Sequence, residues 1–215
     1  MVLPLYLAMG AEEMNGEAPL PRHLGVYGPA AQIRPGAMLI LDDRVPGSLD
    51  PAHIASMVQP ESVLLDFERE PDADSVRIAE ELSRALSCPV AAPPGFLKDP
   101  AHPVFLPPCP LHVPLAEYLH PWQNRNVWLD VTAQQQVITV TPDGTRYSTP
   151  APADRQDGGW FDEVLLCRCT METSKGEVCF TLFDTLETLK KKLEQAAALG
   201  VTRAVGLFQE LNGKL

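Results

Sequence analysis

The chain has 215 residues, of which 45% are hydrophobic and 21% are charged, proportions that exclude wholesale disorder. Acidic residues outnumber basic residues 28 to 17, which gives a net charge of -11. A protein that binds a phosphate backbone needs the opposite balance, so nucleic acid and anionic membranes are poor partners. The 22 prolines favour loops and short strands over a helical bundle. We expect one domain over residues 1–215.

The amino-terminal stretch and the cysteines favour a reducing compartment. Met1–Met9 lacks a basic region and a long apolar run, so it is predicted to be a strand, not a signal peptide. The five cysteines show no disulfide-type pairing, which favours the cytoplasm. Cys167 and Cys169 would share one face of a strand, but their spacing is too short for a zinc knuckle. We therefore expect buried thiols, with no metal and no cofactor.

Eight short runs rich in Val, Ile, Leu and Phe predict β-strands. Most of them are continuously apolar, which is typical of parallel strands buried on both faces. The predicted strands are Leu3–Ala8, Ala37–Leu41, Ser62–Phe67, Pro89–Ala92, Val104–Leu106, Val127–Val131, Glu163–Cys169 and Ala204–Phe208.

Helices are predicted between several of these strands. An apolar stripe over Asp74–Leu86 predicts one helix, with Asp74 as its cap. A second helix is predicted over Asp184–Gly200, beginning at Asp184 with Glu187 completing a capping box. Shorter helices are predicted over Pro51–Val58 and Leu115–Leu119.

Alternating strands and helices predict an α/β fold with a parallel sheet and right-handed crossovers. Eight strands in this length favour a small or incomplete (β/α)8 barrel, since Pro93–Pro103 is too short and proline-rich for a helix. Two β-hairpins are expected as additions, Val137–Tyr147 around Pro-Asp-Gly and Val164–Phe183 around Ser-Lys-Gly. The loop Pro150–Gly159 separates them. The alternative fold is an open mixed α/β sheet.

Acidic residues gather where the predicted parallel strands end, which is where the active site of a barrel lies. An acidic mouth suits neutral or cationic ligands, sugars among them, better than phosphates. We therefore expect a small-molecule or carbohydrate ligand. The strand-end residues considered are Asp42, Asp43, Asp66, Glu68, Glu70, Asp130, Arg168, Gln209 and Glu210. Among them, Asp42, Asp43, Asp130 and Glu210 are the candidate substrate-binding residues.

Asp66 and Glu68 are the candidate catalytic pair. Two residues apart on a strand, they share a face and approach closely. Like charges at short range raise the pKa of one carboxyl, which leaves one group protonated and the other ionised. Cleavage of a glycosidic bond requires this division of roles. A solvated strand end is the alternative interpretation of the same two residues.

The segment Glu61–Glu68 resembles the DxxDxDxE motif of the chitinase-like glycoside hydrolases, which are (β/α)8 barrels. Glu68 matches the catalytic acid of that motif, and Asp66 matches the aspartate that orients the acetamido group of the substrate. Glu61 is a conservative replacement at the first position, whereas Leu64 replaces an aspartate.

Other parts of the sequence resemble the same family less closely. The helix ending at Gly200 and the strand after it are similar to the last helix and strand of such barrels. Phe208 stands where the family has a tryptophan beneath the sugar, so the resemblance makes Phe208 a further candidate substrate-binding residue. The family's tyrosine on the sixth strand would fall near Leu129 and Asp130, where no tyrosine is present. The motif strand is the third predicted strand, whereas the family has it fourth. The resemblance therefore implies either a working glycoside hydrolase or a catalytically lapsed relative.

Two other functions are compatible with these residues. One is a non-catalytic barrel that binds a carbohydrate, a small metabolite or another protein. The other is a divalent-metal enzyme in which Asp42, Asp66, Glu68 and Asp130 supply oxygen ligands. Aromatic residues that could stack on a sugar ring are Tyr27, Trp122, Trp128, Tyr147 and Trp160, of which Trp128 is expected in the core.

Overall fold

The structure is a computed structural model that describes residues 3–10, 22–28, 36–43, 49–52, 54, 60–150, 158–174 and 176–211. Its larger part is an eight-stranded parallel sheet in the order β5-β4-β3-β2-β1-β13-β7-β6. The strands are β1 (Leu5–Met9), β2 (Leu24–Tyr27), β3 (Met38–Asp42), β4 (Ser62–Asp66), β5 (Val90–Ala91), β6 (Val104–Leu106), β7 (Val127–Asp130) and β13 (Val201–Leu207).

The two edges of this sheet meet, so the sheet forms a nearly closed barrel. A parallel bridge joins Ala92 to Val104, and the Phe105 amide donates to the Ala92 carbonyl at 2.8 Å. Around the barrel the strands therefore follow chain order, as in a (β/α)8 barrel. The predicted small TIM-like barrel with hairpin additions is confirmed, and the open mixed sheet is not observed.

Helices pack on the outside of the barrel. They are α2 (Ala73–Ala85), α3 (Leu115–Leu119), η2 (His120–Trp122), α4 (Leu186–Ala198) and the short α5 (Phe208–Leu211). Apolar residues that point outward from the strands form one core under α2 and another under α3 and α4. No helix occurs in the connection between β5 and β6, as the sequence predicts.

Helix positions were predicted well, but their caps were not. The N-cap of α2 is Asp72, not Asp74, because the Asp72 carboxylate accepts from the Ser75 amide at 2.8 Å. Likewise α4 is capped by Thr185, not Asp184. Of the helix predicted over Pro51–Val58, positions 51, 52 and 54 are helical and the others lie outside the described residues.

Two strand predictions were wrong. Leu24–Tyr27 is a barrel strand that the sequence pattern did not reveal, whereas Glu163–Cys169 is not a barrel strand. Residues 163–166 form a turn because the Asp162 carboxylate accepts from the amides of Val164 and Leu165, both at 2.9 Å. The motif strand β4 is therefore the fourth strand of the barrel, not the third.

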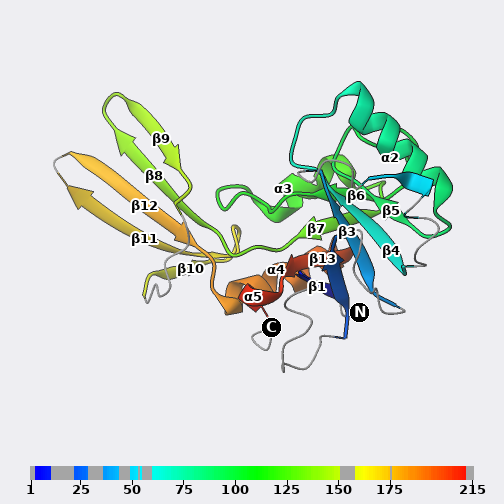
Figure 1. Cartoon of the computed structure of the whole chain (residues 1–215). Coiled ribbons are helices and arrows are strands. Elements are labelled where there is room, and N and C mark those ends of the chain that lie inside the picture. Colours follow the sequence, from blue (N-terminus) through cyan, green and yellow to red (C-terminus); the bar gives the residue numbers. More distant parts are fainter. Residues whose placement is uncertain are drawn as a thin grey trace.

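The insertion between β7 and α4 is a five-stranded antiparallel sheet, here called the arm, which projects from one side of the barrel (Figure 1). Both predicted hairpins belong to it, although Lys175 and residues 151–157 of the predicted loop lie outside the described residues. Its strands are β8 (Gln135–Thr141), β9 (Gly144–Ser148), β10 (Trp160–Asp162), β11 (Cys167–Ser174) and β12 (Glu177–Phe183).

The base of the arm is fixed to the barrel by polar and apolar contacts. The buried Asp184 carboxylate pairs with Lys192 of α4 at 2.7 Å and accepts from the Thr188 hydroxyl at 3.1 Å. Cys167 and Cys169, which share a face as expected, are buried near Leu111. Among the described residues, no helix is both long and apolar enough to cross a bilayer.

The amino end of the barrel is filled by a compensated polar cluster, here called the plug. The guanidinium of Arg203 lies 4.7 Å from the centroid of the Trp128 ring and 3.1 Å from a Glu61 carboxylate oxygen, and it also donates to Ser62. Tyr6 donates to the same Glu61 oxygen at 2.7 Å. Burial and the Glu61 carboxylate raise the pKa of Tyr6 to about 12, so the phenol remains a donor.

Candidate active site

A cavity of about 280 Å³ opens at the carboxyl end of the barrel. Its polar lining consists of Tyr27, Asp66, Glu68, Asp130 and Thr132, which come from three strands and the segments directly after them. Ala8, Leu64, Phe105, Val205 and Leu207 are among the apolar residues that complete the wall. The predicted gathering of acidic strand ends thus occurs for three of the candidate carboxylates.

Strand alternation determines which side chains enter the cavity. On β4, Leu64 and Asp66 point into the barrel, whereas Val63, Leu65 and Phe67 belong to the outer core under α2. The chain keeps this alternation for two residues past the strand, so Glu68 also lines the cavity. Glu68 is exposed and Asp66 is partly buried, so Glu68 lies closer to solvent.

Tyr27 at the end of β2 holds the Asp66 side chain. Its hydroxyl donates to Asp66 Oδ2 at 3.0 Å. Burial raises the pKa of Tyr27, and the negative charges of Asp66, Asp130 and Asp42 raise it further. Tyr27 therefore remains a neutral donor at any physiological pH. The sequence pattern indicated Tyr27 only as a candidate for stacking on a sugar.

Asp130 lies largely buried at the end of β7. Burial raises the pKa of Asp130 to about 7, and the charges of Asp66 and Glu210 raise it while the hydrogen bond from Thr132 lowers it. Thr132 donates to Asp130 Oδ1 at 2.8 Å. Asp130 is thus partly protonated near neutral pH, a property that the sequence pattern did not assign to it.

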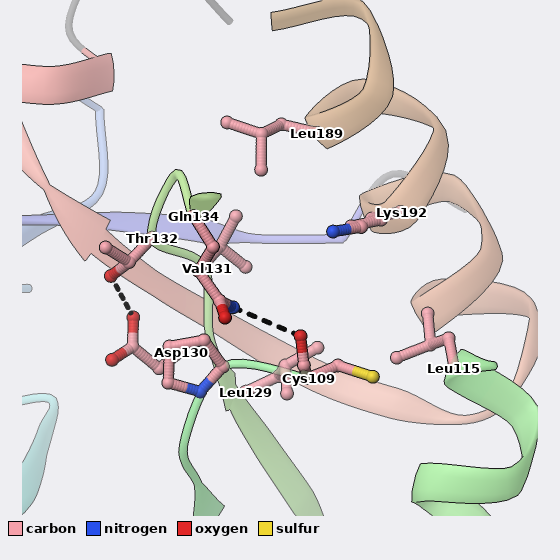
Figure 2. A pocket seen from close by; sticks show the side chains of 10 residues that line it. Cys109, Leu115, Leu129, Asp130, Val131, Thr132, Gln134, Leu189 and Lys192 are labelled. Carbon is pink, nitrogen blue, oxygen red and sulfur yellow. Dashed lines mark hydrogen bonds between the residues drawn. The ribbon is translucent and has the colours of Figure 1, made fainter. Parts of the chain in front are cut away.

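Asp130 and Thr132 also border a second, much smaller cavity of about 20 Å³ between the barrel end and α4. Figure 2 shows Gln134 donating to the Cys109 carbonyl beside it, at 3.1 Å, with Lys192 reaching in from α4. The volume suffices for one water molecule. Asp130 therefore lies between the main cavity and a small, mostly apolar space in the wall behind it.

The other predicted substrate-binding residues lie outside the lining of the main cavity. Asp42 ends β3 in register with Asp66 on the next strand. Asp43 is buried in an ion pair with Arg69 at 2.9 Å. Glu210 accepts weakly from the Ala133 amide and acts on Asp130 through its charge. Phe208 packs against the outer cores.

The corrected strand order changes what the resemblance implies. The sixth strand is β6, not the strand that carries Leu129 and Asp130, and its cavity-lining residue is Phe105. The phenol that the family has on this strand is therefore missing here. The last strand contributes Leu207 to the cavity instead of a tryptophan.

The five aromatic candidates are dispersed. Tyr27 lines the cavity, and Trp128 is buried inside the barrel as expected. Trp122 packs on the outer core, while Tyr147 and Trp160 are exposed on the arm. Among the described residues, no group of three or more His, Cys, Asp or Glu side chains is arranged to hold a metal ion.

Comparison with solved structures gives the class of fold. The spore cortex-lytic enzyme SleL of Bacillus cereus matches with a TM-score of 0.53 and 8% identity, over 95% of this chain and 70% of that one. A glycoside hydrolase family 18 N-acetylglucosaminidase from Paenibacillus barengoltzii matches with a TM-score of 0.50 and 8% identity, over 95% of this chain and 94% of that one. No protein-family model and no curated protein matches the sequence. At this identity the likeness establishes the barrel fold that these enzymes share.

Proposed function

We propose that the cavity binds a saccharide and that the protein is a glycoside hydrolase-like barrel in which Glu68 and Asp66 form the catalytic pair. The observation that carries the proposal is the presence of both carboxylates in one cavity, at the end of the fourth strand of the barrel. Of the two structural neighbours, one is named a spore cortex-lytic enzyme and the other a glycoside hydrolase family 18 N-acetylglucosaminidase. Active sites in this fold lie at the carboxyl end of the strands.

In this proposal Glu68 donates a proton to the glycosidic oxygen as the bond breaks. Its solvent-facing position allows it to be reprotonated from water. Asp66, held by the Tyr27 hydroxyl, orients the acetamido group so that its oxygen attacks the anomeric carbon. This role of Asp66 follows from the resemblance of residues 61–68 to the chitinase-like motif.

The test is turnover of chitooligosaccharide reporters within a broad panel of glycosides. We expect Glu68→Gln to lower kcat at least hundredfold, because the amide cannot donate the proton. Glu70→Gln is the matched control, since Glu70 is exposed two residues away and does not line the cavity. Absence of wild-type turnover across the panel would contradict the catalytic role of Glu68.

A non-catalytic saccharide-binding protein is the second candidate. It is favoured by one observation, namely that Phe105 occupies the wall where the family has a tyrosine hydroxyl. A sugar that raises the melting temperature of the protein without being consumed supports this second candidate. If no sugar is consumed and none shifts the melting temperature, both saccharide proposals are wrong. We also propose a reducing compartment such as the cytoplasm, a proposal that the five free cysteines support.

A further inference from the structure

Asp130 differs from the other carboxylates of the cavity in where it lies. It is the inward-facing residue at the end of β7, largely buried, with one carboxyl oxygen accepting from the Thr132 hydroxyl at 2.8 Å. Figure 2 shows the second carboxyl oxygen turned away from Thr132. Because Asp130 also lines the main cavity, this arrangement presents a carboxyl group to any ligand bound there.

The charged groups around Asp130 disfavour its ionised form. Asp66 from β4 and Glu210 from α5 place negative charge near it. Glu68 lines the same cavity. On the other side, Lys192 of α4 borders the small cavity but is paired with Asp184 at 2.7 Å.

Two phenols complete the surroundings of Asp130. Tyr27 from β2 donates its hydrogen bond to Asp66 and carries no charge, so it does not stabilise an ionised Asp130. Burial raises the pKa of Tyr118 on α3, with further contributions from Cys109 and Asp130, so this phenol also carries no charge. Of the described groups that act on Asp130 at close range, none is therefore an uncompensated cation.

We propose that Asp130 is a neutral carboxylic acid in the working site and donates a hydrogen bond to an acceptor oxygen of a neutral saccharide in the cavity. The proposal rests on the proposed function and deepens it by specifying the ligand. A protonated carboxyl has one donor, which suits the carbonyl of an acetamido group or a sugar hydroxyl. Saccharides that carry a carboxylate or a sulfate are rejected, because Asp66 and Glu68 line the same cavity.

This donor makes ligand affinity depend on pH. Burial and neighbouring carboxylates raise the pKa of Asp130 to about 7, so the binding-competent form predominates at pH 6 and is a minor species at pH 8. When one form alone binds, the apparent affinity falls with its population, which gives about tenfold weaker binding at pH 8 than at pH 6. An ionised ligand-binding carboxylate would give the opposite trend.

The experiment is calorimetric titration with di-N-acetylchitobiose between pH 5.5 and 8.5, with EDTA in all buffers. Wild type should show the fall in affinity, whereas Asp130→Asn should bind with nearly constant affinity, because the amide is a donor at every pH. Glu117→Gln is the matched control, since Glu117 is exposed on α3 and does not line the cavity. It should follow the wild-type profile.

The outcomes separate the two proposals. Constant wild-type affinity across this range, or a pH-dependent affinity retained in Asp130→Asn, overturns the donor role and leaves the saccharide site in place. No binding at any pH overturns the saccharide site and this inference with it.

The carboxyl ¹³C resonance of Asp130 in the wild type tests the protonation of Asp130 without a substitution. A midpoint near 7 supports the inference, and one below about 5, closer to an ordinary aspartate, overturns it.

Discussion

The two ends of the barrel treat charge in opposite ways. At the amino end, the Arg203 guanidinium lies over the Trp128 ring and pairs with Glu61, so the charges of the plug compensate each other. At the carboxyl end, Asp66 and Asp130 lie in one open cavity, where the charge of Asp66 contributes to the raised pKa of Asp130. We expect the first end to contribute more to stability, whereas carboxyl groups of the second line a cavity, where a raised pKa is typical of a functional site.

A substitution in the plug should change the free energy of unfolding more than a substitution at the open end. We expect Arg203→Met to lower the free energy of unfolding by about 3 kcal/mol, because Trp128 loses its cation–π partner and the buried Ser62 hydroxyl loses its hydrogen bond, whereas the pair with the exposed Glu61 adds little. Urea denaturation measures the change. Arg77→Met on α2, where the pair with Glu81 is exposed, should change stability by less than about 0.5 kcal/mol. Equal effects of the two substitutions would contradict the assignment of stability to the plug.

At the open end, removing a carboxyl group should raise the free energy of unfolding rather than lower it. The folded-state pKa of Asp130, about 7, lies above that of an unfolded aspartate, about 3.9. The folded protein therefore retains a proton that the unfolded chain releases, and stability falls as pH rises from about 4 to 7. Asp130→Asn should remove this loss and stabilise the protein by about 2–3 kcal/mol at pH 8.

Thermal or urea unfolding of wild type and Asp130→Asn at pH 4.5 and pH 8 tests this prediction. The gain at pH 8 should shrink at pH 4.5, where the native carboxyl is already neutral. A gain of the same size at both pH values would show that it has another cause than the titration of Asp130.

The smallest expected effect concerns the contact between Tyr27 and Asp66. Tyr27→Phe removes one hydroxyl donor from a carboxylate in the cavity, which we expect to lower stability by about 1 kcal/mol at pH 7. Tyr147→Phe, at an exposed tyrosine of the arm, is the control and should be neutral. A neutral Tyr27→Phe would mean that solvent replaces the hydroxyl without loss.

The barrel was predictable because its strands are continuously apolar, but two strands were not assigned correctly. The four residues of β2 include Gly25, and so few residues with a glycine among them carry little strand signal. The run around Val164 and Leu165 is apolar for a different reason, since Leu165 packs at the base of the arm while the Asp162 carboxylate fixes the turn. One strand was missed before the motif strand and one was wrongly added after it. The total of eight therefore stayed correct, while the motif strand was counted as the third instead of the fourth.

The site was predictable to the level of which strand ends meet. Parallel strands bring Asp66 and Asp130 to the same end of the barrel, whatever the loops between the strands are. The role of each neighbouring residue was not predictable, because it depends on the face that the residue occupies and on the path of the chain beyond its strand. Asp43 lies one position past the inward-facing Asp42 and pairs with Arg69, and Phe208 lies one position past the inward-facing Leu207.

We expect barrel closure to come late in folding. Strand β1 pairs with β13, so that Leu5 lies beside Ala204, with the whole arm between them in the sequence. During synthesis β1 and β7 must wait with one unpaired edge each until the last strand emerges, and such edges invite association with other chains. The arm, built from neighbouring hairpins, can form earlier and bring α4 and β13 to the opening that they close.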